Sequence, residues 1–200
     1  MIDSVAAVTG RDVSRETMEK LQAYEQMVAE ESARQNLISR ITLDDFWGRH
    51  VLDSAQLLRF ASQEANWADI GSGAGLPGIV IACLTNSPVL LIEPRRLRAE
   101  FLERVVERLG LTATVHHGKA ESATGQHDVV TARAVAPLSK LIEISHHLST
   151  GNGLFLFPKG KSAESELAEA RRTWQGSFHV ERSMTDPNSL IVLARDVRRR

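Results

Sequence analysis

The residues most suggestive of chemistry form a glycine-rich turn at residues 69–78, which reads DIGSGAGLPG. Glycines are required where a strand turns sharply into a helix and the backbone approaches a ligand closely, because no side chain is then in the way. The following helix offers free N–H groups and a positive dipole end, and Pro77 suits its first turn. The turn is therefore predicted to hold a nucleotide-like ligand in the crevice beside a strand of an open α/β sheet.

Two ligand classes fit this turn. Residues 73–78 satisfy the G-x-G-x-x-G pattern of dinucleotide-binding proteins. Asp69, however, gives the longer pattern D-x-G-x-G-x-G, and a carboxylate there can hold the ammonium group of a methionine moiety, directly or through water. Glu93 closes the next predicted strand, where an acid can accept from both hydroxyls of a ribose. These acids favour S-adenosylmethionine, whereas the alternative interpretation is that both acids only cap neighbouring helices.

The elements that must position this turn alternate between apolar runs and helical patterns. Five strands are expected at 67–70, 89–92, 113–115, 128–132 and 154–157, and helices at 79–84, 95–109, 137–148 and 162–174. Two last strands, 178–183 and 190–194, are joined by a turn at 186–188. Alternation predicts a parallel sheet covered on both faces, and the closing hairpin adds one antiparallel strand. The expected fold class is α/β: a class I S-adenosylmethionine-dependent methyltransferase fold, Rossmann-like, with a mainly parallel seven-stranded sheet.

Residues 1–60 are predicted to form an N-terminal helical appendage, and residues 61–200 the methyltransferase domain. A first helix is expected over 14–34, a loop over 36–40, and a second helix beginning at Thr42, where TLDD resembles a capping box. The basic segment 195–200 at the end of the chain is expected to be frayed.

Composition sets broad limits on the class of protein. The chain has 200 residues, 42% of them hydrophobic and 24% charged, which is ordinary for one soluble globular domain. Its formal net charge of −1 excludes a nucleic-acid coating protein, although a local basic patch could still serve a site-specific RNA enzyme. No apolar run is long enough for a bilayer, no secretory signal is seen, and the single Cys83 excludes an internal disulfide. A cytoplasmic monomer without membrane contact is expected.

Several separated motifs carry a resemblance to one family. They are Asn36-Leu37, the stretch RHVLDS at 49–54, the glycine turn, the stretch TARAVA at 131–136, and Lys159-Gly160. In this order and spacing they resemble the bacterial 16S ribosomal RNA guanine-N7 methyltransferases, the RsmG or glucose-inhibited division protein B family. The combination of G-x-G-x-G-L-P-G with R-H-x-L-D-S is much more specific than the glycines alone. Glu93 and Thr131 stand where aspartate and serine are as common, and both changes keep the chemical group.

The resemblance implies transfer of a methyl group from S-adenosylmethionine to N7 of one guanine of 16S ribosomal RNA, guanine 527 by that resemblance, with S-adenosylhomocysteine as product. N7 exposes a lone pair, so no proton must leave and no general base is needed. Positioning and exclusion of water should dominate. The absence of an obvious catalytic triad or metal cluster agrees with this, and no metal is expected. The implied cofactor contacts, together with those argued from the residues, are Asp69, Gly71, Gly73, Gly75, Leu76, Glu93, Ala120, Glu121 and Arg133.

Four further residues are predicted to position the substrate or the cofactor. Arg133 and Lys159 follow the fourth and fifth strands; Arg133 is expected at the methionine carboxylate or the RNA, and Lys159 at a phosphate or the guanine O6. His50 and Asp53 share a helix face that would close over the methionine end of the pocket. The alternatives are surface salt bridges for the two basic residues and a local His–Asp pair that joins the appendage to the main domain.

The RNA partner, whether 16S rRNA or a small-subunit particle, is expected to meet basic residues around the cofactor mouth. These are Arg95, Arg96, Arg98, Lys140, Lys159 and Lys161. A solvated helix face explains the arginine run equally well. Two other functions stay open from the sequence: a class I methyltransferase with a different substrate, since fold does not dictate substrate, and a nucleotide-binding module for a nicotinamide cofactor.

Overall fold

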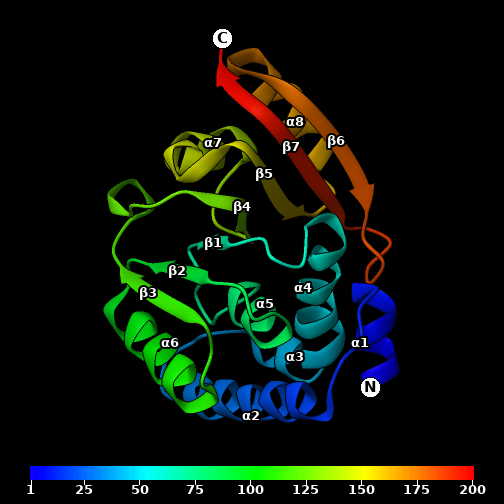
Figure 1. Ribbon diagram of the computed structural model, residues 1–200, viewed down its shortest axis with the longest axis vertical. Coiled ribbons are helices and arrows are strands. Elements are labelled where there is room, and N and C mark those ends of the chain that lie inside the picture. The colour runs from blue at the N-terminus through cyan, green and yellow to red at the C-terminus, as the bar shows by residue number, and fades with distance from the viewer.

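A computed structural model describes residues 1–200, and its centre is one seven-stranded sheet in the order β3-β2-β1-β4-β5-β7-β6 (Figure 1). The strands are β1 (Trp67–Ile70), β2 (Val89–Glu93), β3 (Ala113–His117), β4 (His127–Ala132), β5 (Ser149–Lys159), β6 (Trp174–Arg182) and β7 (Leu190–Arg199). Strands β1 to β5 pair in parallel, and β7 runs antiparallel to both β5 and β6. The predicted fold class, including the single antiparallel strand, is confirmed.

Helices cover both faces of the sheet. They are α1 (Ile2–Thr9), α2 (Arg15–Ser32), α3 (Arg40–Leu43), α4 (Asp53–Ala55), α5 (Gly78–Leu84), α6 (Arg96–Leu109), α7 (Leu138–Ser145) and α8 (Ala163–Thr173). A π-helix, η1 (Trp47–Leu52), and three 3₁₀ turns, η2 (Gln56–Phe60), η3 (Ala120–Ser122) and η4 (His146–Leu148), complete the chain. Figure 1 shows α2, α5 and α6 on one side of the sheet and α7 and α8 on the other.

Successive residues of the central strands point to opposite faces of the sheet, and both faces are buried under helices. In β5, Leu154 and Leu156 belong to the hydrophobic core under α5 and α6, whereas Phe155 and Phe157 belong to the core under α7 and α8. Strands buried on both faces read as continuous apolar runs, which is why the sequence predicts them by length and composition rather than by alternation.

The N-terminal helices are part of the larger of these two cores. Leu21 and Val28 of α2 are fully buried in the same cluster as residues of α5 and α6. The helical appendage therefore shares a hydrophobic core with the rest of the chain, and its division from a methyltransferase domain at residue 60 stays a prediction. No helix of the structure has the length and apolar content to span a membrane.

The cap of the second helical segment differs from the prediction. The hydroxyl of Ser39, and not that of Thr42, accepts the hydrogen bond from a helical N–H, namely the N–H of Thr42 at 3.3 Å. Both residue types are good N-caps, and the backbone of Ser39 has the extended conformation that a cap requires (φ −71°, ψ 150°). The helix therefore begins at Arg40, two residues before the predicted Thr42, and ends at Leu43. The helix α1 is an additional element that the sequence did not predict.

The C-terminal basic segment is also different, because it is not frayed. β7 continues through Arg199, whose Cα is paired with that of Trp174, the first residue of β6. Exposed arginine side chains do not weaken a strand whose backbone is paired, so the hydrophilic composition was misleading here. The hairpin itself, with its turn near 186–188, is confirmed.

Candidate active site

The glycine turn has the left-handed backbone that its sequence predicts. Gly71, Gly73 and Gly75 have φ values of 67°, 60° and 101°, which side chains rarely adopt. A Cβ on Gly75 would lie 2.5 Å from Cγ1 of Ile79, whereas one on Gly73 would meet nothing closer than 3.7 Å. Packing thus excludes a side chain at Gly75, while Gly73 leaves open space in front of the turn.

Asp69 is the next-to-last residue of β1, just before the glycine turn, and is completely buried. Its Oδ2 accepts the N–H of Gly78 at 3.0 Å, at the start of α5, and its Oδ1 is buried with no partner. Burial raises the pKa of the carboxyl to about 7, although the nearby Ser72 hydroxyl and the hydrogen bond from Gly78 lower it. A buried acceptor without a donor fits the ammonium group of S-adenosylmethionine, so the residue caps α5 and still has an oxygen available.

Glu93 ties the glycine turn to the end of β2. Its Oε2 accepts the N–H of Gly73 at 2.9 Å and its Oε1 accepts the N–H of Arg95 at 2.8 Å. The residue is 2% exposed. Each carboxylate oxygen has a second lone pair, so further hydrogen bonds from ribose hydroxyls remain possible in chemical terms. The ribose contact stays a prediction, and the capping role is observed.

The sequence reasoning missed the contribution of α2 to the cofactor side. Tyr24 is fully buried and donates its hydroxyl hydrogen to the carbonyl oxygen of Ala74 in the glycine turn, at 2.8 Å. Burial raises the pKa of this hydroxyl well above its usual value, so it remains a donor. A buried tyrosine usually finds such a partner, and Tyr24 is the only tyrosine in the chain, which is the signal that could have singled it out.

Ala120 and Glu121 lie in η3, directly after β3. Ala120 is buried, whereas the Glu121 side chain is exposed and makes no hydrogen bond or ion pair in the structure. Their contact with the adenine edge therefore stays a prediction, and no protein group forms a hydrogen bond or ion pair with the carboxylate of Glu121.

Arg133 links the end of β4 to the N-terminal helices. One terminal nitrogen of its guanidinium donates to the carbonyl of Arg49 (3.2 Å) and to Oδ2 of Asp53 (3.1 Å), and the other lies 3.0 Å from Nδ1 of His50. A guanidinium has five N–H donors, so two stay available. The predicted residues His50, Asp53 and Arg133 are thus brought together.

His50 is neutral in this arrangement. Burial lowers its pKa to about 4, and the neighbouring charges of Arg133 and Arg49 add to that effect. Nδ1 faces a donor, so the proton is assigned to Nε2, which is buried without a partner. The residue lies in the π-helix η1, and such local widening of a helix is frequent at functional sites.

Lys159 ends β5 and forms a partly buried ion pair. Its ammonium group is 2.8 Å from Oε2 of Glu166 and donates to the carbonyl of Ala136 at 2.7 Å. The side chain is only 10% exposed. Glu166, which the sequence reasoning did not single out, also accepts from the N–H of Leu138, and hydrogen bonds from Lys159 are the main cause that lowers the pKa of this carboxyl against the effect of burial. Lys159 thus forms a partly buried ion pair, not a surface salt bridge, and keeps one N–H for a further partner. Its contact with the substrate stays a prediction.

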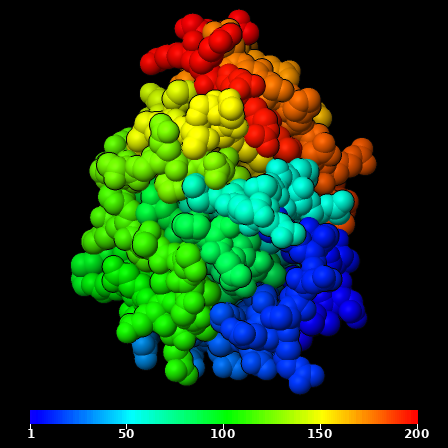
Figure 2. All heavy atoms as spheres, viewed as in Figure 1, coloured from blue at the N-terminus to red at the C-terminus, as the bar shows by residue number.

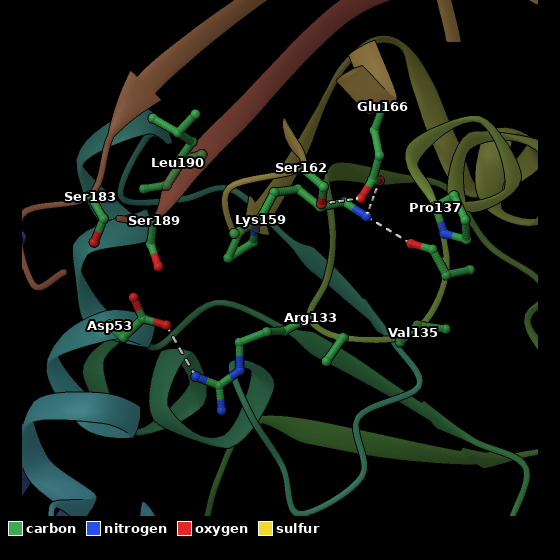
Figure 3. Close-up of a pocket in the computed structure, with 15 residues that line it drawn as sticks. Asp53, Arg133, Val135, Pro137, Lys159, Ser162, Glu166, Ser183, Ser189 and Leu190 are labelled. Atoms are coloured by element: carbon green, nitrogen blue, oxygen red, sulfur yellow. Dashed lines mark hydrogen bonds and ion pairs between the residues drawn. The ribbon is translucent and has the colours of Figure 1, made fainter. Parts of the chain in front are cut away.

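Two adjoining cavities flank the Asp53–Arg133 pair. The first, about 530 Å³, lies at the ends of β4 and β5; its lining includes Asp53, Arg133 and Lys159 (Figure 3). The second, about 610 Å³, lies on the other side of the pair and includes His50. Figure 3 shows Arg133 and Lys159 on opposite walls of the first cavity, each paired with a carboxylate. Glu93 and Glu121 line neither cavity.

Comparison with known proteins decides between the ligand classes. The model of the family described as rRNA small subunit methyltransferase G matches residues 17–189. The chain belongs to this family. It is 47% identical over 192 residues to the ribosomal RNA small subunit methyltransferase G of Zymomonas mobilis, covering 91% of this chain and 87% of that protein. The protein of the same name from Rhizorhabdus wittichii is 42% identical over 201 residues, with 98% and 92% covered.

Solved structures show the same fold at low sequence identity. M. jannaschii TYW2 in complex with AdoMet has a TM-score of 0.61 at 12% identity, over 84% of this chain and 80% of that one. TrmN from Thermus thermophilus has a TM-score of 0.58 at 14% identity, over 76% and 50%. With the family assignment, these findings make the protein an S-adenosylmethionine-dependent methyltransferase, and the dinucleotide alternative is dropped.

Proposed function

We propose that this protein methylates N7 of a single guanine in 16S ribosomal RNA, position 527 by resemblance, with S-adenosylmethionine as donor. The observation that carries the proposal is the position of Arg133. It follows the end of β4, at the same edge of the sheet as the glycine turn, and it lines the cavity of about 530 Å³. The chain also belongs to the rRNA small subunit methyltransferase G family. The particle on which it acts, a cytoplasmic location and a monomeric state remain predictions.

The bound cofactor supplies a methyl group on a sulfonium, an electrophile that needs no activation by the protein. With the cofactor bound, the lone pair of guanine N7 would take the methyl group, the carbon–sulfur electron pair would stay with sulfur, and the positive charge would move to the base. No protein group has to take a proton in this reaction, and Nδ1 of His50, in the second cavity, is already engaged by Arg133. Catalysis then depends on alignment of N7 with the methyl group and on exclusion of water.

On the cofactor side, Asp69 and Glu93 are proposed to hold the two ends of the ligand. The unpaired Oδ1 of Asp69 accepts from the ammonium group, and Glu93 accepts from the ribose while it continues to hold Gly73. Gly71, Gly73, Gly75 and Leu76 provide the backbone against which the ligand lies, and Glu121 with Ala120 is placed at the adenine edge. Arg133 has two spare N–H groups for the methionine carboxylate or for RNA.

On the substrate side, the first cavity combines polar donors with apolar walls. Guanine presents O6 beside N7 on the same edge, and the remaining N–H of Lys159 is proposed to donate to O6 or to a phosphate. Val135, Pro137 and Leu190 line the cavity and give flat apolar surface for the faces of the base. Arg95 and Arg96, both exposed at the start of α6, are proposed to contact phosphates outside it.

The experiment that tests the function is deletion of the gene, followed by mass-spectrometric mapping of 7-methylguanine in the small-subunit RNA. We expect loss of one such base, restored by the wild-type gene and not by an Arg133→Ala variant. Purified protein with small-subunit RNA or particles and labelled cofactor gives the matched assay in vitro. Retention of every 7-methylguanine after deletion would contradict the proposed substrate while cofactor binding remained valid.

A further inference from the structure

Gln56 is a buried amide that connects two distant parts of the chain. It begins η2, is 1% exposed, and lines neither of the two cavities. Its side chain reaches the turn between β6 and β7, where it is hydrogen-bonded to Ser183, Met184 and Thr185. In Figure 2 the cyan stretch of the chain, which includes residues 50–60, lies between the blue N-terminal helices and the orange and red hairpin.

The partners of this amide fix its orientation. Oε1 accepts the backbone N–H of Met184 at 2.8 Å, and Nε2 donates to Oδ1 of Asp53 at 2.9 Å and lies 3.0 Å from Oγ of Ser183. A backbone N–H can only donate and a carboxylate can only accept, so the amide fits in one orientation alone. Both ends of the side chain are satisfied, as a fully buried polar group requires.

The turn held by Gln56 forms walls of both cavities. Ser183 and Ser189 line the first cavity, and the segment from Thr185 to Ser189 lines the second. The turn is closed within itself by the N–H of Ser183, which donates to the carbonyl of Ser189 at 3.0 Å. The bond between Ser183 and Ser189 closes the turn, whereas the hydrogen bonds from Gln56 fix the position of the turn relative to η2.

Asp53 connects the same network to Arg133. Its Oδ1 accepts from Nε2 of Gln56 and from the hydroxyl of Thr185 at 3.0 Å, and its Oδ2 accepts from Arg133 at 3.1 Å. The carboxylate is thus oriented on one side by Gln56 and the turn, and on the other by the arginine at the cavity entrance. Arg133 keeps two other partners, His50 and the carbonyl of Arg49, that do not depend on Gln56.

We infer that Gln56 is a positioning residue for the RNA substrate: it holds the Ser183–Ser189 turn and the Asp53 carboxylate in the places that shape the base cavity. This inference rests on the proposed function. The glycine turn and Glu93 lie outside the network, and Arg133 keeps its bonds to His50 and the carbonyl of Arg49 without Gln56. Loss of Gln56 should therefore change the RNA step and leave cofactor binding unchanged. A displacement of a cavity wall by an ångström is enough to cost about tenfold or more in positioning.

The test compares Gln56→Leu with Gln56→Glu, whose carboxylate would face Asp53 and repel it. We expect the KM for small-subunit RNA to rise by about tenfold in both variants, and the Kd for S-adenosylhomocysteine, measured by calorimetry, to change by less than about twofold. Thr185→Val removes the hydroxyl that contacts Asp53, Ser183 and Gln56 but keeps the bonds of Gln56 to Met184 and Asp53. It should raise the KM less and should not add to Gln56→Leu in the double variant. The N–H of Met184 should exchange faster with solvent in Gln56→Leu.

Val105→Ala is the matched control, because Val105 is buried in α6 and distant from the turn. An RNA KM equally raised in Val105→Ala at similar thermal stability would overturn the inference, as would a cofactor Kd that weakens as much as the RNA KM. Should Gln56→Leu fail to fold, the Thr185→Val comparison decides on its own, and an unchanged KM there overturns the inference. Absence of methylation by the wild-type protein would instead overturn the proposed function, and this inference with it.

Discussion

The buried carboxyl of Asp69 makes cofactor binding depend on pH in a specific way. In the free protein burial raises its pKa to about 7, so the group is largely protonated at pH 6. The ammonium group of the cofactor interacts favourably only with the ionised form. Binding must therefore remove a proton from Asp69 below pH 7, and affinity should increase with pH until the carboxyl is ionised in the free protein.

The pKa value sets the size of this effect. For a ligand that binds the ionised form alone, the observed Kd is multiplied by one plus the ratio of protonated to ionised Asp69. With a pKa of about 7, that factor is about 11 at pH 6 and about 1.3 at pH 7.5, so affinity should rise about eightfold, or about 1.2 kcal/mol. His50, with its pKa near 4, does not titrate in this interval.

Calorimetric titration with S-adenosylhomocysteine between pH 6 and pH 7.5 measures the effect, and buffers of different ionisation enthalpy count the released proton, about 0.9 at pH 6. Two controls isolate Asp69: the variant Asp69→Asn, which cannot ionise, and methylthioadenosine, a ligand without the amino acid part. Both should give a flat profile. A flat profile for S-adenosylhomocysteine, or an equal slope for methylthioadenosine, would refute the proposed contact between Asp69 and the ammonium group.

Three further substitutions follow from the geometry. Arg133→Lys keeps the charge but cannot serve His50, Asp53 and the carbonyl of Arg49 together, so kcat/KM for RNA methylation should fall by about a hundredfold, and a wild-type rate would contradict its role. Lys159→Met leaves Glu166 unpaired and should cost about 2 kcal/mol in urea unfolding; adding Glu166→Leu should restore stability but not methylation, and restored methylation would show that Lys159 only holds the fold. Gly75→Ala should lower Tm far more than Gly73→Ala, because only the first Cβ would collide with Ile79; equal shifts in thermal unfolding would count against this steric explanation.

The parts of the fold that local sequence determines could be predicted. Apart from β3, which reads ATVHH, the parallel strands contain short apolar runs. The glycine turn marks the passage from β1 to α5. Errors arose where tertiary pairing decided the outcome. Ser39 and Thr42 are both acceptable caps, and only the backbone conformation selects Ser39. The arginines of β7 are held in a strand by backbone bonds to β6, which their side chains do not indicate.

The same distinction applies to the site. Asp69 and Glu93 could be proposed from the sequence because of their positions relative to the glycine turn, and their contacts with the cofactor stay predictions. The partner of Lys159 lies one helix further on, and the partners of Gln56 lie at Ser183 to Thr185, at the far end of the chain. No pattern of residue types distinguishes a glutamine that will be buried against a turn from one that will be solvated. Gln56 is buried and hydrogen-bonded only because η2 packs against the β6–β7 hairpin, and the sequence does not show this packing.

The alternatives weighed for the acids, helix cap or cofactor ligand, do not exclude each other. A carboxylate has about four lone-pair positions, and the structure uses one of them on Asp69 and two on Glu93. The hydrogen bonds that stabilise the glycine turn without cofactor leave some of these lone pairs without a donor from the protein. This is most unfavourable for Asp69, whose buried Oδ1 has no partner and whose pKa is raised by burial. A purely structural cap would gain nothing from that buried, unpaired oxygen, so the raised pKa of Asp69 is the physical argument for a cationic ligand at this position.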